Sequence, residues 1–155
     1  MVTSTLSTIH KHNQCISGAK IRFMDRMKEQ NKSVGKNDKP VLNLLLSNHG
    51  AFTAYDIAET LSNKVKRLQP IQIYRSLEKL IALGVVHRLA TRNSFIACYE
   101  TGVCATSQFL ICTKCENVEE IGSQRLDQEI QDSANKKNFT IISKNVEVLG
   151  LCSKC

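Results

Sequence analysis

The sequence predicts an α+β protein in two parts, a helical first part that ends in a β-hairpin and a smaller second part that mixes strands with one helix. Up to Gly84, apolar residues recur at intervals of three and four, which is typical of helices that bury one face. After Gly84, short β-like runs predominate. Six of the seven cysteines follow residue 97, so the second part also holds most of the thiols.

The first two helices are expected on either side of a polar loop. One helix should cover residues 16–27, whose apolar side chains share one face, and the loop should cover residues 31–39. A second helix should begin at Asp38 and Pro40, because Asp can accept bonds from first-turn amides and Pro fits that turn. It should end at Asn48-His49-Gly50.

Two further helices are expected before the hairpin. A third helix should open at Thr53, with Asp56 positioned to complete a capping box. After the basic stretch 64–67, a fourth helix should run from about Pro70 to Leu83 and stop at Gly84.

The hairpin is predicted from two β-like runs, residues 85–89 and 94–98, which are separated by the turn residues 90–93. Helices followed by such a hairpin describe a winged helix-turn-helix, in which the last helix enters the major groove of DNA and the hairpin meets the phosphate backbone. The free face of the fourth helix would carry Gln72, Arg75, Ser76 and Lys79. A small helical bundle with a merely solvated face remains an alternative.

The second part has the pattern of a compact α/β unit of the β-β-α-β kind. Strands are expected over 109–111 and 118–121, a helix from Ser123, and β-like runs over 139–142 and 146–149. Because so small a unit buries little surface alone, we expect it to pair with a second copy and form a homodimer.

Two C-x-x-C pairs stand out in this unit, Cys112 with Cys115 and Cys152 with Cys155. The two-residue gap lets both sulfurs of a pair face one ion, and two pairs supply the four thiolates of a structural zinc site. A redox pair would normally lie near a thioredoxin-like βαβ pattern, which the sequence lacks. The odd number of cysteines also argues against a disulfide framework.

Charge and composition narrow the class of protein further. The net charge of +7 favours encounters with polyanions such as nucleic acid, although many basic proteins are merely soluble. No stretch approaches the roughly 20 apolar residues that span a bilayer, and residues 1–15 lack the apolar core of a secretory signal. We therefore expect a cytoplasmic protein with no membrane partner.

A looser set of metal-ligand types comprises His87, Cys98, Cys104 and Glu120. Sulfur and imidazole donors suit zinc, whereas iron(II) and manganese prefer more oxygen and nitrogen. On spacing alone this set is weak, because a lone His on a strand or a lone buried Cys is more often a structural residue.

Several segments together resemble the ferric uptake regulator family, and the Cys98 run is most similar to its zinc-sensing branch. The segments are Ala54-Tyr55-Asp56-Ile57, Ile73-Tyr74-Arg75-Ser76-Leu77, Gly84-Val85-Val86-His87-Arg88, Asn93-Ser94-Phe95-Ile96-Ala97-Cys98 and the two C-x-x-C pairs. The likeness runs from about residue 15 to the C-terminus. Iron-type members carry a His-rich cluster before the first pair, whereas this chain has no His after His87.

This resemblance implies a homodimeric repressor of zinc-uptake genes that binds operator DNA when zinc is present. Each chain would hold two zinc ions. The structural zinc ligands would be Cys112, Cys115, Cys152 and Cys155, and the regulatory zinc ligands would be His87, Cys98, Cys104 and Glu120. Cys104 is the least direct of these assignments, because the family's fourth ligand is a His at the position of its neighbour Ala105.

The resemblance also implies which residues contact DNA. The family's DNA-reading residues match Tyr55 and Arg75, while Tyr74 would serve the core or a phosphate. Gln72 and Lys79 join them as DNA-binding residues from the pattern of the fourth helix. The family's Thr-Pro-x-Arg helix start is absent from the stretch 33–40, where Lys36 or Lys39 could replace the phosphate contact.

The expected boundaries are residues 1–98 for the winged-helix domain, with 1–14 as a disordered tail, 99–105 for a hinge, and 106–155 for dimerisation and zinc binding. An iron- or peroxide-sensing regulator is disfavoured by the sulfur-rich hinge set. A zinc enzyme such as a deaminase is disfavoured because no Glu follows His87 two residues on. A zinc-stabilised protein-interaction module remains open, and salt-dependent binding to duplex DNA would separate it from a repressor.

Overall fold

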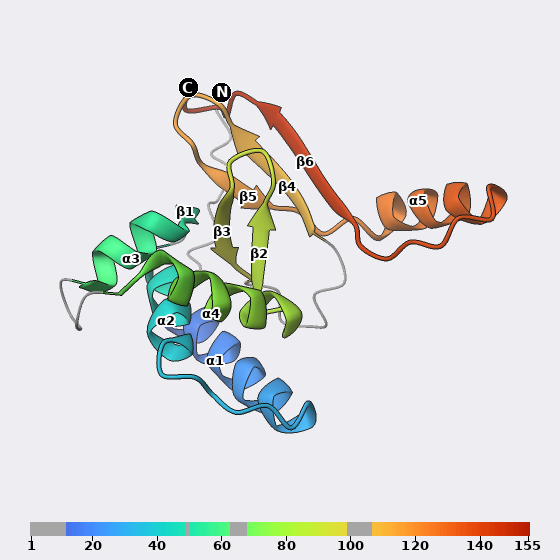
Figure 1. The fold of residues 1–155 in the computed structure, drawn as a ribbon. Helices are drawn as coiled ribbons and strands as arrows, with labels where there is room; N and C mark the ends of the chain where they lie inside the picture. Colours follow the sequence, from blue (N-terminus) through green and yellow to red (C-terminus); the bar gives the residue numbers. More distant parts are fainter. Residues whose placement is uncertain (1–11, 49, 63–67, 99–106) are drawn as a thin grey trace.

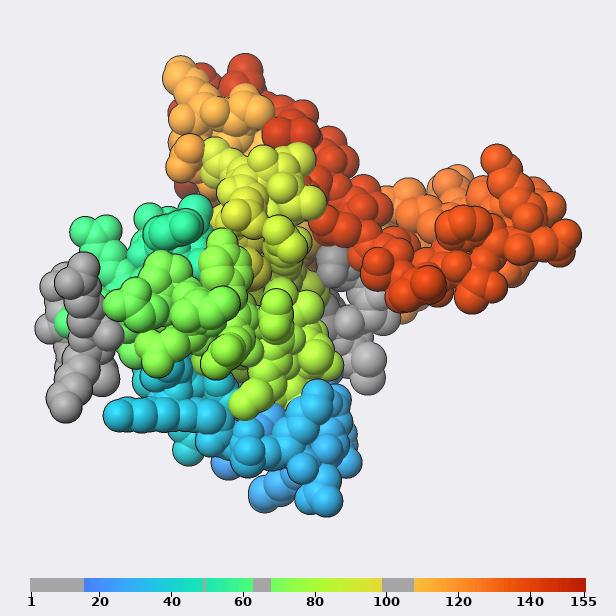
Figure 2. All heavy atoms as spheres, viewed as in Figure 1, coloured from blue at the N-terminus to red at the C-terminus, as the bar shows by residue number. Residues whose placement is uncertain are grey.

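The computed structural model describes residues 12–48, 50–62, 68–98 and 107–155. Figure 1 shows a helical part with a β-hairpin and a second sheet, and one helix projects away from both, as Figure 2 also shows. The helices are α1 (His12–Glu29), α2 (Asp38–Asn48), α3 (Ala54–Ser62), α4 (Pro70–Ala82) and α5 (Gln124–Lys136). The strands are β1 (Phe52–Thr53), β2 (Val86–Leu89), β3 (Ser94–Ala97), β4 (Ser107–Cys112), β5 (Val118–Glu120) and β6 (Asn145–Gly150). None of the helices in these ranges is long and apolar enough to cross a membrane.

The first part is a winged helix, as the sequence predicts. Helices α1–α4 share one core, and its fully buried side chains include Leu45, Ile57 and Leu77. Each such side chain stabilises the fold by about 1.5–3 kcal/mol. The sheet is antiparallel with the order β1-β3-β2. Strand β1 was not predicted, because two residues are too few to show the alternation that identifies a strand.

Helix α4 is fixed at both ends. At its start, Gln69 and Gln72 form a reciprocal capping box and Pro70 occupies the first turn. At its end, Gly84 adopts a φ of 64°, in the left-handed region that favours glycine. Arg26 from α1 donates to the carbonyl oxygens of Leu83 and Gly84, at 2.5 and 2.8 Å. This end therefore sets the direction in which the chain enters β2.

A buried carboxylate ties α4 to α2. Asp38 is only 2% exposed, and it accepts hydrogen bonds from Ser76 Oγ at 2.9 Å and Lys79 Nζ at 2.8 Å. The backbone N–H of Gly35 donates to the same carboxylate at 2.6 Å. Burial acts to raise the pKa of Asp38, but the bonds from Lys79, Gly35 and Ser76 outweigh it and hold the pKa below its ordinary value.

The second part is a three-stranded sheet with the order β5-β4-β6, in which β4 and β5 are antiparallel and β4 and β6 are parallel. The predicted strand over 139–142 is wrong, because this segment is irregular and leaves Phe139 66% and Ile142 97% exposed. Both edges of β4 are already occupied by β5 and β6, and residues 139–142 lie on the path that returns the chain from α5 to β6.

The hairpin joins the two parts. Leu89 and Ile96 of the hairpin form one buried cluster with Phe109 and Ile111 of β4. Strand β3 is buried along its whole length, which follows from its contact with helices on one side and with β4 on the other. Figure 1 shows the β2–β3 hairpin lying against the second sheet.

Candidate metal centres

Four thiols meet at the end of the second sheet. Cys112 ends β4, and the parallel register pairs it with Gly150, so that the residues after β6 lie beside the turn that carries Cys115. The sulfurs of Cys112, Cys115, Cys152 and Cys155 all lie within 4.8 Å of one another. Tetrahedral zinc with Zn–S bonds of about 2.3 Å holds its sulfurs about 3.8 Å apart, so this set fits a structural zinc ion.

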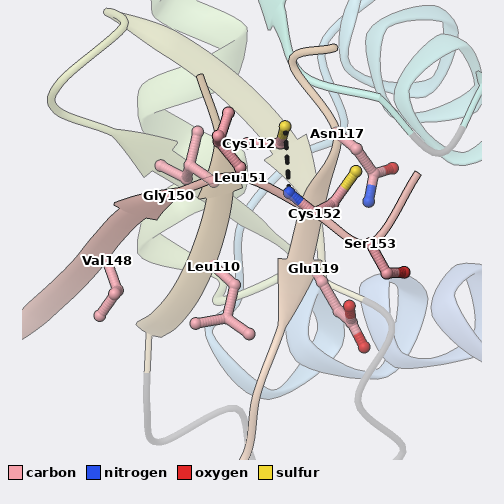
Figure 3. Close-up of a pocket in the computed structure, with 10 residues that line it drawn as sticks. Leu110, Cys112, Asn117, Glu119, Val148, Gly150, Leu151, Cys152 and Ser153 are labelled. Carbon is pink, nitrogen blue, oxygen red and sulfur yellow. Dashed lines mark hydrogen bonds between the residues drawn. The ribbon is translucent and has the colours of Figure 1, made fainter. Parts of the chain in front are cut away.

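The backbone around this thiol cluster favours a thiolate at Cys112. The N–H groups of Cys115, Cys152 and Lys114 donate to its sulfur and lower the pKa of Cys112 to about 5. One of these bonds, from Cys152 N to Cys112 Sγ at 3.4 Å, is drawn in Figure 3. Bonds with Cys115 and Cys152 raise the pKa of the Cys155 thiol to about 12. A divalent cation would offset the repulsion among several thiolates at these distances.

A second cluster lies between the two parts of the molecule. His87 is on β2, Cys98 follows β3, and Glu120 ends β5. Their potential ligand atoms all lie within 4.8 Å of one another, and His87 Nε2 is 3.3 Å from Glu120 Oε1. Arg22 of α1 donates to the carbonyl oxygen of Cys98 at 3.1 Å, which helps to fix that residue. The hairpin supplies nitrogen and sulfur, and the second sheet supplies oxygen.

Electrostatics in this second cluster favour a proton on His87. Burial acts to lower the pKa of His87, but hydrogen bonds to Cys98 and Glu120 and their negative charge raise it to about 9. A metal ion would have to displace this proton in order to bind the imidazole. Sulfur, nitrogen and oxygen donors in one buried set fit zinc.

The predicted DNA-binding residues fall into two groups. Tyr55 is 66% exposed on α3, and Gln72 and Arg75 are exposed on α4. Tyr74 is partly buried and its ring meets Phe95 edge-on at 6.2 Å. Ser76 and Lys79, which were expected on the free face of α4, instead bond Asp38 of α2, and Ser76 is buried.

Some predicted residues lie outside the part of the chain that the structure describes, and two residues of interest were not predicted. Cys104, the expected hinge 99–105 and residues 1–11 of the expected tail 1–14 fall outside the described residues. The expectation of a disordered tail is wrong for residues 12–14, because α1 begins at His12. Ile71 carried no sequence signal of function; it is 60% exposed in the first turn of α4, away from the face that the helix buries. Glu147 carried none either, because its partners Ala90 and Thr91 lie 57 and 56 residues away.

A winged helix joined to a small sheet by a cluster of sulfur, nitrogen and oxygen ligands, with a second cluster of four thiols, defines a metal-binding helix-turn-helix protein. The model of the Ferric uptake regulator family matches residues 29–149. The chain belongs to this family.

Individual relatives agree with this membership. The zinc uptake regulation protein of Escherichia coli strain K12 is 30% identical over 116 residues, which cover 74% of this chain and 68% of the relative. A zinc uptake regulator solved in complex with zinc and DNA is 25% identical, has a TM-score of 0.82, and aligns over 94% of this chain and 95% of the other.

A further relative, XcZur, has been solved in two states. Its holo structure is 26% identical with a TM-score of 0.77, and covers 90% of this chain and 97% of its own. Its apo structure is 25% identical with a TM-score of 0.51, and covers 95% of this chain and 99% of its own. As a whole, this chain is therefore structurally more similar to the holo form than to the apo form.

Proposed function

We propose that this protein is a zinc-responsive, DNA-binding transcriptional repressor that controls zinc-uptake genes, with zinc as its co-repressor. The observation that carries this proposal is the cluster of His87, Cys98 and Glu120, which takes ligands from both parts of the molecule. The similarity to zinc uptake regulators, one of them solved with zinc and DNA, supports it. The protein would act as a regulator rather than as an enzyme.

Two zinc ions per chain would have different roles. Cys112, Cys115, Cys152 and Cys155 would hold a structural ion, whose binding free energy adds directly to the stability of the second sheet. His87, Cys98 and Glu120 would hold the regulatory ion, with Cys104 as the proposed fourth ligand. Sulfur in both sets favours zinc over iron(II) and manganese, which argues against an iron sensor.

The regulatory ligands would couple zinc to DNA through orientation. His87 and Cys98 move with the winged helix, whereas Glu120 moves with the second sheet. Ligation of one ion by all three residues requires one relative placement of the two parts. Zinc shifts the population toward that placement only to the extent that it binds this placement more tightly than others. The greater similarity to holo than to apo XcZur supports this interpretation.

The DNA interface would be the exposed side of α3 and α4. Arg75 can donate two bonds to a guanine edge, Tyr55 can pack against a base, and Ile71 can contact a thymine methyl group. Gln72 Oε1 accepts from the N–H of Gln69 at 3.1 Å, so its amide nitrogen would be the group that donates to DNA. The contact between Lys79 and Asp38 supports a role in orienting α4 for Lys79.

We propose that the winged helix (1–98), the hinge (99–105) and the dimerisation unit (106–155) form one half of a homodimer. The second sheet offers an apolar surface for this contact, because Leu110, Val148 and Leu151 are 41%, 48% and 69% exposed. Figure 3 shows them around the pocket beside Cys112 and Cys152. The winged helices of the two chains, here called the heads, would then bind two half-sites on one face of the DNA.

The proposal is tested with a duplex selected from a random pool by the zinc-loaded protein. Fluorescence anisotropy should show that micromolar zinc strengthens binding at least tenfold over protein that has lost only its removable ion. His87→Ala should abolish this response while its structural zinc content, measured by mass spectrometry, stays at one per chain. Equal affinity for the duplex at all zinc concentrations would contradict the proposal.

A further inference from the structure

The tip of the hairpin is bound by the second sheet at a point remote from the regulatory ligands. Glu147 of β6 accepts the backbone N–H groups of Ala90 and Thr91 at 2.6 and 3.0 Å. Its carboxylate also accepts the Thr91 hydroxyl, and Asn145 Nδ2 at 2.6 Å. Four donors therefore converge on one carboxylate.

This carboxylate is held in its charged form. Burial acts to raise the pKa of Glu147, but the bonds from Thr91, Ala90 and Asn145 outweigh it and lower the pKa. Hydrogen bonds to an ionised acceptor are roughly twice as strong as neutral ones. The contact is therefore stronger than an ordinary loop contact, although it lies at the surface.

A second contact holds the same tip. Arg92 Nη2 lies 2.7 Å from Glu116 Oε1, and Arg92 Nη1 donates to the carbonyl oxygen of Glu116 at 3.4 Å. Glu116 follows Cys115 in the turn of the first C-x-x-C pair and has a φ of 62°. The tip is thus attached both to β6 and to the turn that carries two of the cluster thiols.

These contacts lie at the opposite end of the hairpin from the regulatory ligands. Glu147 and Glu116 bind the turn at residues 90–92, whereas His87 and Cys98 lie toward the opposite end, where the strands meet the helices. A strand of four residues spans about 13 Å, so the tip contacts and the ligands are separated along the hairpin, and the buried cluster that the hairpin shares with β4 lies between them. Bonds at the tip restrict rotation of the hairpin about this cluster, and such rotation would move His87 and Cys98 relative to Glu120.

We propose, resting on the proposed function above, that Glu147 is a positioning residue of the regulatory metal site. By holding the hairpin tip before the metal binds, it keeps His87 and Cys98 within reach of Glu120. The hairpin is then already ordered when zinc binds, so less conformational entropy is lost on ligation. This strengthens the binding of zinc and, through zinc, the binding of DNA. Glu147 touches neither the ion nor the DNA.

The test uses Glu147→Gln in the full-length protein that retains its structural zinc. Cobalt(II) is titrated into the regulatory site, because its absorption bands report tetrahedral ligation by sulfur and nitrogen. The affinity of this site should fall about ten- to hundredfold, the range seen when partners outside the ligand shell are lost. Structural zinc per chain should not change.

A second readout does not depend on the metal. The amides of Ala90 and Thr91 should exchange with deuterium faster in the variant than in the parent protein, before any cobalt is added. The matched control is Glu129→Gln on α5, whose carboxylate contacts the exposed Arg125 at 3.3 Å and which should change neither measurement. Thr91→Ala should give a smaller loss than Glu147→Gln, Thr91→Ser should restore the affinity, and the double variant should be no weaker than Glu147→Gln alone.

Three results separate the possibilities. Unchanged cobalt affinity in Glu147→Gln, with a normal response in the parent, would overturn the positioning role and leave the proposed function intact. A parallel loss of structural zinc and of thermal stability would assign Glu147 a purely structural role and also overturn it. No cobalt binding by the parent at His87, Cys98 and Glu120 would contradict the proposed function itself.

Discussion

Asp38 stabilises the first part through three bonds to one buried carboxylate. Asp38→Asn removes the charge that Lys79, Ser76 and Gly35 N–H recognise, and hydrogen bonds to charged groups contribute about 1.5–3 kcal/mol. We therefore expect the free energy of unfolding to fall by about 2 kcal/mol at pH 7, as measured by urea titration. Asp25→Asn, at an exposed position of α1, should change it little.

The same residue predicts a dependence on pH. The pKa of Asp38 lies below its ordinary value of 3.8 in the folded protein, so the unfolded chain binds the proton first as the pH falls. The stability that Asp38 contributes is therefore complete above about pH 4 and is lost as the pH falls through the folded pKa. Asp38→Asn should flatten the acid limb of the stability curve. An unchanged acid limb would show that other carboxylates dominate it.

His87 predicts a pH dependence of opposite sign. Its folded pKa of about 9 exceeds the ordinary 6.5, so protonated His87 stabilises the protein without regulatory metal fully below pH 6.5, and this contribution is lost as the pH rises toward 9. Zinc must displace that proton, so the apparent zinc affinity of the regulatory site should rise about tenfold per pH unit between pH 7 and 9. Competition with a chromophoric chelator measures this slope, and a slope of zero would contradict proton displacement at His87.

The functional residues differ in how well the sequence alone predicts them. The two C-x-x-C pairs were recognisable because their ligands are close in sequence, and the structure brings their sulfurs together. His87, Cys98 and Glu120 carried little signal alone, since they are distant in sequence and only the fold gathers them. Glu147 carried none, because the hairpin-tip donors that it accepts lie 56 and 57 residues away in the sequence and only the fold brings them to it.

Gly84 is the point at which α4 turns into the hairpin. Any other residue there would have to hold the left-handed conformation that Gly84 adopts, at a cost of about 1–2 kcal/mol, and its Cβ would lie 2.6 Å from Arg26 Nη1. Gly84→Ala should therefore lower the free energy of unfolding by about 1–2 kcal/mol, measured by thermal or urea unfolding. Gly18→Ala in α1 is the matched control. Its Cβ would meet Arg22 Nη1 at 3.5 Å, an ordinary contact distance, and the change should stabilise the helix by up to about 1 kcal/mol.

Helices were predicted better than strands for a physical reason. The helices could be predicted from the spacing of their apolar residues and from local caps such as the Thr53–Asp56 pair. The structure contains the backbone and hydroxyl bonds of this pair. A strand depends on a distant partner, and for residues 139–142 neither edge of β4 is available. An apolar run therefore predicted β6 correctly, whereas the preceding run, residues 139–142, was predicted wrongly as a strand.

The exposed apolar surface of the second sheet predicts how two chains associate. Val148 pairs in register with Leu110 on the neighbouring strand, and both are substantially exposed. Val148→Asp should bury an unpaired charge in the proposed interface and convert the dimer to monomers, as measured by sedimentation velocity. Ile21→Asp, at a position 60% exposed on α1, is the control and should leave the dimer intact. A monomeric parent protein would contradict the proposed assembly.

The attachment of the hairpin tip limits which parts of each winged helix are available to contact DNA. The amides of Ala90 and Thr91 are committed to Glu147 and the Arg92 side chain to Glu116, so this turn has little left to offer a phosphate. In the proposed interface, contact with an operator would then depend on α3 and α4, which would span only a few base pairs of one groove. Selectivity would come largely from the spacing between paired heads, and inserting half a helical turn of DNA between half-sites should weaken binding more than any single base change.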